Sequence, residues 1–340
     1  MTEPTVTVLM SAYNAEHHLA EAVDSVLAQT FRDLEFLIFD DGSTDSTLRI
    51  LRGYSDPRIR LVENSENQGL TRNLERGMRM ARGEFVARMD ADDICMPQRL
   101  ERQVEYLRAH PDIAVLGSAV TFFGEGRDSF IGYQPLEHAE IKCALLYGYT
   151  MLHPSVMIRR AEFEKHGLNY DPAFPVSQDH DLWVRAIRKV RFANLHESLV
   201  QLRLHPAKIG STHSSLQQEF SDVVRHRQLA ELGIAASTQE LSVLVGPSAH
   251  AEMWTGHDCR MLEALLLQIF SANSALSIYA QDVLVRMGVE HFRGICRQLL
   301  VAGNTSGRCY WRSALRRLDR PSIRNVIGLA YRSVIGVHMQ

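Results

Sequence analysis

The chain has 340 residues, of which 45% are hydrophobic and 23% are charged. This length favours one large domain with an appendage, or two domains, and the composition is typical of a globular protein. The formal net charge of −3 excludes a general electrostatic attraction to nucleic acid. The 5 cysteines are dispersed without a C-x-x-C pair, which predicts reduced thiols.

The first 120 residues alternate between short apolar runs and amphipathic segments. The apolar runs predict strands that are buried on both faces, and the segments with helical spacing predict helices. Alternation of this kind is typical of a mainly parallel sheet with helices on both faces. The predicted strands span residues 5–10, 34–39, 59–62, 84–90 and 113–120, and the predicted helices span residues 15–29, 45–54, 69–81 and 97–109.

Polar side chains follow three of these strands at the point where each strand ends. They are Tyr13 and Asn14, then Asp40 and Asp41, then Asp90, Asp92 and Asp93. Ligands of such sheets bind beyond the carboxyl ends of the strands, so we expect these side chains to meet at one edge. Several carboxylates at one edge repel each other without a cation. Since Mg²⁺ binds to one or two carboxylates and to substrate phosphate oxygens, the pattern predicts a divalent cation and a phosphorylated ligand.

Three stretches of the chain together resemble glycosyltransferase family 2, whose members are inverting enzymes with a GT-A fold. They read VTVLMSAYNAEHHLAEAVDSVLAQTF, LEFLIFDDGSTDST and ENQGLTRNLERGMRMARGEFVARMDADD. The triplet Asp90-Ala91-Asp92 matches the D-x-D motif of the family. The resemblance continues more loosely through HPSVMIRR, SQDHDLWVRA and LRLHPAKIGS, and it covers about the first 215 residues.

The resemblance implies a nucleotide-sugar donor and a divalent metal ion for this region. The residues implied to contact the donor are Tyr13, Asn14, Asp40, Asp41, Asn67, Arg72, Asp90 and Ala91. Asp92, Asp90 and His205 are implied to contact Mn²⁺ or Mg²⁺. The ion would neutralise the diphosphate leaving group as a Lewis acid.

The resemblance further implies that Asp179 is the general base. A single displacement at the anomeric carbon needs one positioned carboxylate that takes the proton of the acceptor hydroxyl. The family usually has Glu before this aspartate, whereas this chain has Gln178, which keeps hydrogen bonding but has no charge. Asp181 stands two residues further on. We expect Asp181 to cap the helix that carries Trp183, or to support the site from behind.

His153 and Trp183 are candidates for the acceptor or sugar side of the site. Each is equally compatible with a residue of the buried core. Structural roles also remain open on the donor side. Asp40 and Asp41 could form a turn around Gly42, and Arg72 could be a solvated residue of a helix.

From about residue 216 onward the pattern becomes helical, with apolar residues at three- and four-residue spacing. The predicted helices span residues 217–232, 259–273 and 277–300, and a further helix begins near Thr238. The stretch from Arg308 to Arg332 is basic and amphipathic, which is typical of a membrane-surface contact. The alternatives are a helix packed on the domain and a contact between copies of the chain.

Together these patterns predict a GT-A catalytic domain over residues 1–215 and a mostly helical region over residues 216–340. Residues 1–110 would form the nucleotide-binding half and residues 111–215 the acceptor half. By the resemblance, we expect transfer of a sugar from a nucleotide-diphosphate sugar, with UDP favoured, to a saccharide or lipid-linked acceptor. Family analogy suggests cell-surface polysaccharide or glycolipid synthesis.

Two other classes of function are the alternatives. A sugar nucleotidyltransferase would have a glycine-rich, basic loop after the first strand, but that turn reads Ser-Ala-Tyr-Asn-Ala-Glu. A non-catalytic subunit that binds nucleotide sugars would not need Asp179, which is present. No signal peptide and no stretch of roughly 20 apolar residues is evident. We therefore expect a cytoplasmic protein, either free or peripheral at the inner face of the membrane.

Overall fold

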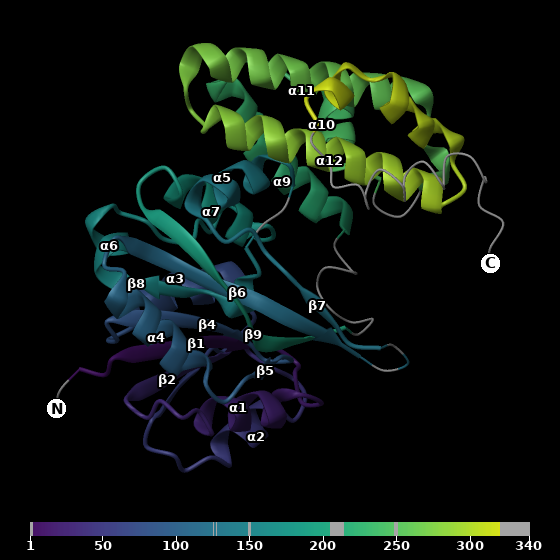
Figure 1. Cartoon of the computed structure of the whole chain (residues 1–340). Helices are drawn as coiled ribbons and strands as arrows, with labels where there is room; N and C mark the ends of the chain where they lie inside the picture. The colour runs from purple at the N-terminus through teal and green to yellow at the C-terminus, as the bar shows by residue number, and fades with distance from the viewer. Residues whose placement is uncertain are drawn as a thin grey trace. The chain divides into compact units, whose positions relative to one another are not determined.

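The computed structural model describes residues 3–124, 126, 128–148, 151–204, 214–247 and 251–319. The chain divides into two compact units. Unit 1 comprises residues 1–141 and 150–221, and unit 2 comprises residues 142–149 and 222–340. Figure 1 labels the elements of both units, and each unit is treated by itself below.

Unit 1 is built on one sheet, which has nine strands within the described residues. The strand order is β3-β2-β1-β4-β8-β6-β9-β5, and β7 pairs with β6 outside this path. The strands are β1 (Val6–Ala12), β2 (Leu34–Asp40), β3 (Ile59–Glu63), β4 (Phe85–Asp90), β5 (Ile94–Cys95), β6 (Ile113–Phe123), β7 (Phe130–Gly132), β8 (Met157–Arg159) and β9 (Arg191–Arg203).

The parallel pairing predicted from the alternating pattern is found in the block β3-β2-β1-β4 and in the pair β6-β9. The sheet as a whole is mixed, because β8 runs antiparallel to both β4 and β6. The short strands β5 and β7 also pair in the antiparallel sense. Since β8 lies between two strands of the same direction, the carboxyl ends of β4 and β6 point to the same edge.

Helices cover both faces of this sheet, as predicted. On one face, α1 (Leu19–Leu27) and α4 (Arg99–Ala109) share a buried core with alternate strand residues such as Val8 and Phe36. On the other face, α3 (Leu70–Met80) packs closely, since a Cβ on Gly77 would lie 2.3 Å from Cδ1 of Leu9. The remaining helices with residues in unit 1 are α2 (Thr47–Arg52), α5 (His138–Leu146), η1 (His153–Ser155), α6 (Arg160–Lys165), α7 (Gln178–Ala186) and α9 (Ser214–Glu231).

The first predicted helix begins later than its pattern suggested. It was expected over residues 15–29, whereas α1 begins at Leu19. The main-chain N–H groups of Ala15 and Glu16 donate instead to the side chains of Thr47 and Asp45, at 2.7 and 3.1 Å. These two contacts hold residues 13–16 in a turn beside the start of α2.

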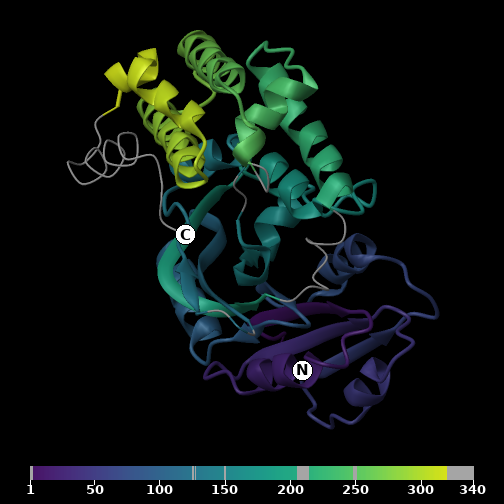
Figure 2. The ribbon, with the colours of Figure 1, turned by 90° about the vertical axis from the view of Figure 1, so that its right-hand side faces the viewer.

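Unit 2 is helical, as predicted from the spacing of its apolar residues. It contains residues 222–231 of α9, the short helix α10 (Thr238–Val245) and the long helices α11 (Gly256–Leu276) and α12 (Gln281–Val301). The last three contact one another in the order α10, α11, α12, and both views show them side by side (Figures 1 and 2). Ser237 and Thr255 start α10 and α11 with capping boxes, which satisfy N–H groups that have no partner inside the helix.

The basic stretch near the end of the chain is folded onto unit 2 as far as it is described. It forms the short 3-10 helices η3 (Thr305–Arg312) and η4 (Ala314–Arg317), after η2 (Ala251–Met253) earlier in the unit. Tyr310 and Leu315 are buried, and the Tyr310 hydroxyl donates to Oδ2 of Asp319 at 2.6 Å. The rest of the predicted membrane-surface segment, residues 320–332, lies outside the described residues. Among the helices that are described, none is long and apolar enough to cross a membrane.

Candidate active site

The carboxyl ends of β1, β2 and β4 meet at one edge of the sheet in unit 1. In the strand register, Ala12 of β1 lies beside Asp40 of β2, and Ser11 lies beside Asp90 of β4. The polar residues that follow these strands therefore start from adjoining positions. This is the arrangement that was expected from the sequence alone.

Three carboxylates form a cluster just beyond β4. One oxygen atom each of Asp90, Asp92 and Asp93 lies within 4.8 Å of the others, and Asp93 is fully buried. Ala91, between the first two, is also buried. Like charges at this spacing repel each other, whereas hard divalent cations bind to such sets of oxygen atoms. The residues present thus fit the Mn²⁺ or Mg²⁺ ion expected from the D-x-D pattern.

A buried arginine accompanies this cluster. Arg88 stands two residues before Asp90 on β4, so both side chains leave the same face of the strand, and they form an ion pair. Arg88 is only 3% exposed. Burial by itself would lower the pKa of Arg88, but Asp90, Tyr170 and Asp93 outweigh burial and raise the pKa. Arg88 was not predicted from the sequence, although a charged side chain inside the apolar strand FVARMD is a usable signal.

Asp41 organises the loop that follows β3. Its carboxylate accepts hydrogen bonds from Nδ2 of Asn64 at 2.9 Å, from the Gln68 N–H at 2.8 Å and from the Gly69 N–H at 3.0 Å. Asp41 is 2% exposed, whereas Asn67 within the loop is exposed. Asp41 therefore has a structural role, because its carboxylate holds the loop that contains the exposed Asn67.

Two turns at this edge are tied together. Asn14, in the left-handed conformation with φ 47°, accepts the Thr44 N–H on its Oδ1 at 2.9 Å and donates its own N–H to Oγ of Ser43 at 3.1 Å. Asp40 is buried, and its Oδ2 accepts the Ser43 N–H at 3.3 Å. Thus Asn14 and Asp40 shape the turn, and Tyr13 beside them keeps 49% of its surface exposed.

Gly42 is the residue that permits this close approach. Its φ is +70°, which favours glycine, and a Cβ there would lie 2.6 Å from the carbonyl carbon of Glu66. The loop of residues 64–69 therefore lies directly against the turn after β2. Arg72 is exposed on the first turn of α3, which starts at the end of this loop.

Asp179 lies on the first turn of α7, after Ser177, whose φ of 54° is left-handed. The His180 N–H donates to Oδ1 of Asp179 at 2.8 Å. Burial raises the pKa of Asp179 above its usual range, and the charge of Asp90 raises it further, while Arg88 and the backbone hydrogen bonds act in the opposite direction. The fold thus brings Asp179 into the electrostatic neighbourhood of the carboxylate cluster, and a raised pKa suits a group that must accept a proton.

Asp181 does not cap α7, as one of its two expected roles required, because the N-cap residue is Ser177 and no side chain among the described residues caps it. It is 1% exposed, and Nε of Arg185, one turn further along α7, donates to its Oδ2 at 2.8 Å. Its N–H donates to the Ser177 carbonyl at 3.1 Å. Gln178 is also buried. Asp181 is therefore held by Arg185, and Asp179 stays the predicted base of this helix turn.

His153 and Trp183 belong to a buried aromatic group. Nε2 of His153 lies 2.7 Å from the Tyr170 hydroxyl oxygen, and burial holds the pKa of His153 well below its usual value. The Trp183 ring meets His153 and Phe192 edge-on, with ring centroids 6.0 Å apart in both cases. Trp183 is 0% exposed, so its ring cannot stack on a sugar in this structure. Its surroundings are those of a core residue, although its Nε1 is buried without a hydrogen-bond partner among the described residues.

His205 lies outside the described residues, so its predicted contact with the metal has no structural counterpart here. Tyr170, which was not predicted from the sequence, lies beside His153 and within the electrostatic influence of charged residues of the site. Its hydroxyl faces His153, and the charges of Arg88 and Asp179 both act on it. Arg88 lies far from Tyr170 in the sequence, so no local pattern indicated that the two residues interact.

Comparison with known proteins decides the family. Residues 7–168 match the family model described as glycosyl transferase family 2. An uncharacterized glycosyltransferase of Haemophilus influenzae is 34% identical over 238 residues, which cover 66% of this chain and 73% of that protein. The chain belongs to glycosyl transferase family 2. An uncharacterized glycosyltransferase of Methanocaldococcus jannaschii is 33% identical over 211 residues, which cover 60% of this chain and 72% of the relative.

Solved structures show the same fold at lower identity. The structure of S. aureus TarS 1–349 in complex with UDP-GlcNAc has a TM-score of 0.59 and 16% identity, and the match covers 79% of this chain and 83% of that one. The mannosyltransferase PcManGT from Pyrobaculum calidifontis, in complex with GDP-Man and Mn²⁺, has a TM-score of 0.50 and 18% identity, with 98% and 88% covered. The predicted family, GT-A fold and glycosyltransferase class are confirmed.

Proposed function

We propose that this glycosyltransferase is inverting and metal-dependent, with a nucleotide-diphosphate sugar as donor and a hydroxyl group as acceptor. One observation carries the proposal. The carboxylate cluster after β4 and the carboxylate of Asp179 lie close enough for the charge of Asp90 to raise the pKa of Asp179. A metal-binding group and a separate proton acceptor are the two parts that an inverting transfer needs.

The donor side is assigned to the edge where β1, β2 and β4 end. Asp92 and Asp90 would hold Mn²⁺ or Mg²⁺, and His205 is proposed as a further contact. A divalent ion there supplies Lewis-acid neutralisation of the diphosphate. The exposed Tyr13 ring offers a face on which a nucleobase can stack. Asn67 and Arg72, both exposed at the same edge, supply an amide and a cation for the nucleotide.

Asp179 is assigned as the general base. Its carboxylate takes the proton of the acceptor hydroxyl while that oxygen bonds to the anomeric carbon. The bond from this carbon to the diphosphate oxygen breaks in the same step, so the electron pair leaves with the nucleoside diphosphate. A single displacement of this kind inverts the anomeric configuration. Arg88, which is ion-paired with Asp90, offsets part of the negative charge at the site before a metal ion is bound.

The remaining assignments extend the same proposal. We assign catalysis to residues 1–215 and treat residues 216–340 as a helical region. The two compact units support this division near residue 221, although residues 142–149 belong to the second unit. A UDP sugar is favoured by the family, and the TarS complex contains UDP-GlcNAc. A saccharide or lipid-linked acceptor in cell-surface polysaccharide or glycolipid synthesis, reached from the cytoplasmic side of the membrane, is the proposed setting.

Thermal unfolding with a panel of nucleotides tests the donor site. UDP, dTDP, GDP and CDP are each added with Mn²⁺ and with EDTA. A ligand at about 100 times its dissociation constant adds about 2.7 kcal/mol of stability. We expect one nucleotide to raise Tm with Mn²⁺ only, and we expect this rise to vanish in Asp92→Asn. Asp112→Asn, which alters an exposed aspartate paired with Arg191, is the matched control. No rise with any nucleotide would contradict the donor assignment.

Product analysis tests the reaction class. Incubation of the stabilising nucleotide's sugar conjugate with the enzyme should release nucleoside diphosphate, whereas a nucleotidyltransferase would form or consume pyrophosphate. With an acceptor in hand, proton NMR of the new linkage should show the anomer opposite to that of the donor. Retention of configuration would contradict the assignment of Asp179 as the single base.

A further inference from the structure

Arg203, the last residue of β9, contacts the carboxylate cluster from the opposite strand. Its main-chain N–H donates to Oδ1 of Asp93 at 2.8 Å, and its Nε donates to the main-chain oxygen of Asp92 at 3.0 Å. One residue therefore holds two successive residues of the cluster. Nothing in the D-x-D pattern points to it, because Arg203 is 111 positions away from Asp92.

The rest of the Arg203 side chain is fixed as well. Its guanidinium forms an ion pair with Glu21 of α1, and its Cζ lies 4.5 Å from the centre of the Phe123 ring at the end of β6. The side chain is only 16% exposed. A planar guanidinium can donate in several directions at once and can lie on an aromatic ring. Arg203 uses both properties, so it has little freedom to turn.

The strands around Arg203 make this contact part of the sheet. The short strand β5 follows the cluster directly and runs antiparallel to β9, with Ile94 beside Gln201 and Cys95 beside Val200. On the other side of β9, Arg203 lies beside Phe123. The turn that carries the three carboxylates is therefore anchored at both ends, by β4 before it and by the β5–β9 pair after it. The hydrogen bonds from Arg203 to Asp92 and Asp93 are part of this second attachment.

We propose that Arg203 is a positioning residue of the metal site, a role that rests on the proposed function. By holding the carbonyl group of Asp92, it fixes the backbone from which the Asp92 side chain reaches the ion, and its N–H fixes the orientation of the Asp93 carboxylate. Arg203 binds neither metal nor substrate in this role. Partners that orient metal ligands in this way typically change metal affinity about 10-fold to 100-fold when they are removed.

Isothermal titration calorimetry of Mn²⁺ into the full chain tests the role. The titration is made with whichever of UDP, dTDP, GDP and CDP raises Tm in the wild type, and again without nucleotide. In Arg203→Gln, the Mn²⁺ dissociation constant should rise about tenfold. Arg203→Lys keeps the charge but not the fork of donors, so it should recover only part of the affinity. At a Mn²⁺ concentration that saturates each variant, nucleotide affinity should equal that of the wild type, because Arg203 makes no contact with the nucleotide in this role.

Arg102→Gln is the matched control. Arg102 also ties a helix to β9, through Glu197, but it is 44% exposed and lies on α4. This variant should bind Mn²⁺ as the wild type does, and its Tm should fall only slightly, because an exposed ion pair contributes little stability. Wild-type affinity in Arg203→Gln overturns the proposal, as does a loss of affinity that Arg102→Gln shares. If the wild type itself binds no Mn²⁺, the proposed donor site fails and the role of Arg203 fails with it.

Discussion

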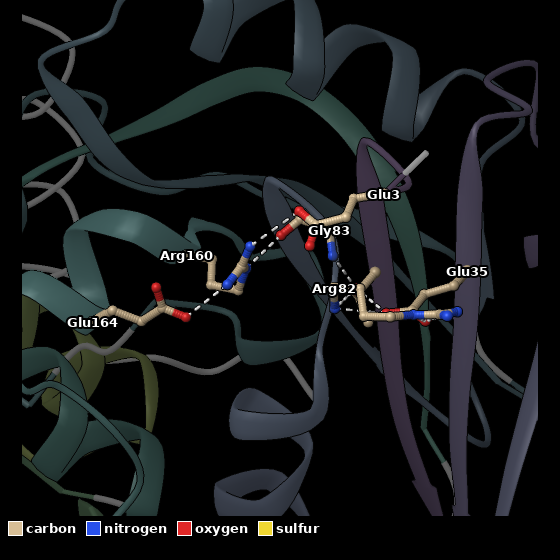
Figure 3. Close-up of polar contacts among 7 residues, drawn as sticks. Glu3, Glu35, Arg82, Gly83, Arg160 and Glu164 are labelled. Atoms are coloured by element: carbon tan, nitrogen blue, oxygen red, sulfur yellow. Dashed lines mark hydrogen bonds and ion pairs between the residues drawn. The ribbon is translucent and has the colours of Figure 1, made fainter. Parts of the chain in front are cut away.

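Carboxylate side chains have different partners at the two edges of the unit 1 sheet. At the amino edge, Glu35 accepts hydrogen bonds from the Thr7 hydroxyl at 2.7 Å, from the Arg82 N–H at 2.8 Å and from Nε of Arg82 at 2.7 Å. Nearby, Nε of Arg160 donates to the Gly83 carbonyl at 2.8 Å (Figure 3). At the carboxyl edge, three carboxylates lie within 4.8 Å of one another. The first arrangement is complete within the protein, whereas the second is suited to a cation.

The pKa values of the acidic side chains Glu35 and Asp179 are shifted in opposite directions at the two edges. Burial by itself would raise the pKa of Glu35, but hydrogen bonds from Thr7 and Arg82 outweigh it, and the pKa is lowered. At the other edge, burial and Asp90 together raise the pKa of Asp179. The charged form of Glu35 is thus stabilised by its partners, whereas burial makes the charged form of Asp179 costly, which suits the proton acceptor that we propose. The following changes test this contrast, from the largest expected effect to the smallest.

Removing the base should have the largest effect on turnover. Asp179→Asn keeps the size of the side chain but cannot accept the proton, so kcat should fall about 10³-fold. Metal-dependent nucleotide binding should persist, because the carboxylate cluster is unchanged. Single-turnover assays and the nucleotide thermal shift measure the two quantities separately. A variant with more than about a tenth of wild-type kcat would show that another group takes the proton.

Removing a carboxylate of the cluster should act through the metal. Asp92→Ala should lower kcat/KM about 10²-fold at saturating Mn²⁺, since charge on the leaving group is then poorly neutralised. In EDTA, however, its Tm should not fall below that of the wild type, because one of three mutually repelling charges is gone. Differential scanning calorimetry in EDTA checks this second outcome. A marked loss of stability in EDTA would mean that the cluster is held by the protein alone.

The contact between the turn after β2 and the loop of residues 64–69 can be tested with glycine substitutions. Gly42→Ala should destabilise the protein by about 2 kcal/mol, because it combines a positive φ with a Cβ 2.6 Å from Glu66. Gly167→Ala is the control, since Gly167 has φ +60° with no atom within 4 Å of the added Cβ. Urea denaturation gives both free energies of unfolding. Equal losses would mean that strain at φ explains the effect, and that the loop is not tightly packed there.

A substitution at the amino edge should lower the stability of the protein and leave its catalytic activity unchanged. Glu35→Gln should lower the free energy of unfolding by about 1 kcal/mol near neutral pH, with kcat and KM unaltered. Because the folded-state pKa of Glu35 is lowered, its stabilising contribution is complete above the unfolded pKa of about 4.3 and is lost as the pH falls through the folded value. The difference in Tm between wild type and variant should therefore shrink in acid. A difference that stays constant down to pH of about 3 would contradict the lowered pKa.

The sequence by itself determined the parts of the protein that depend on local pattern. Alternating apolar runs predicted β1 to β4 and the helices between them, because buried parallel strands leave little room for polar residues. The position of Asp40 and Asp90 at the ends of their strands was enough to bring them to one edge, as the register shows. The motifs also indicated the family, which the relatives confirm.

Only the tertiary structure decided how distant segments complete the site. The antiparallel insertion of β8, the pairing of β5 with β9 and the contact of Arg203 with Asp92 join residues far apart in the chain. The same is true of Trp183, whose complete burial depends on rings from other elements. A side chain's periodicity shows which face of its own helix or strand it occupies, but not what lies opposite. That partner is set by the packing of the whole sheet, where a buried polar group is stable only if a suitable partner meets it.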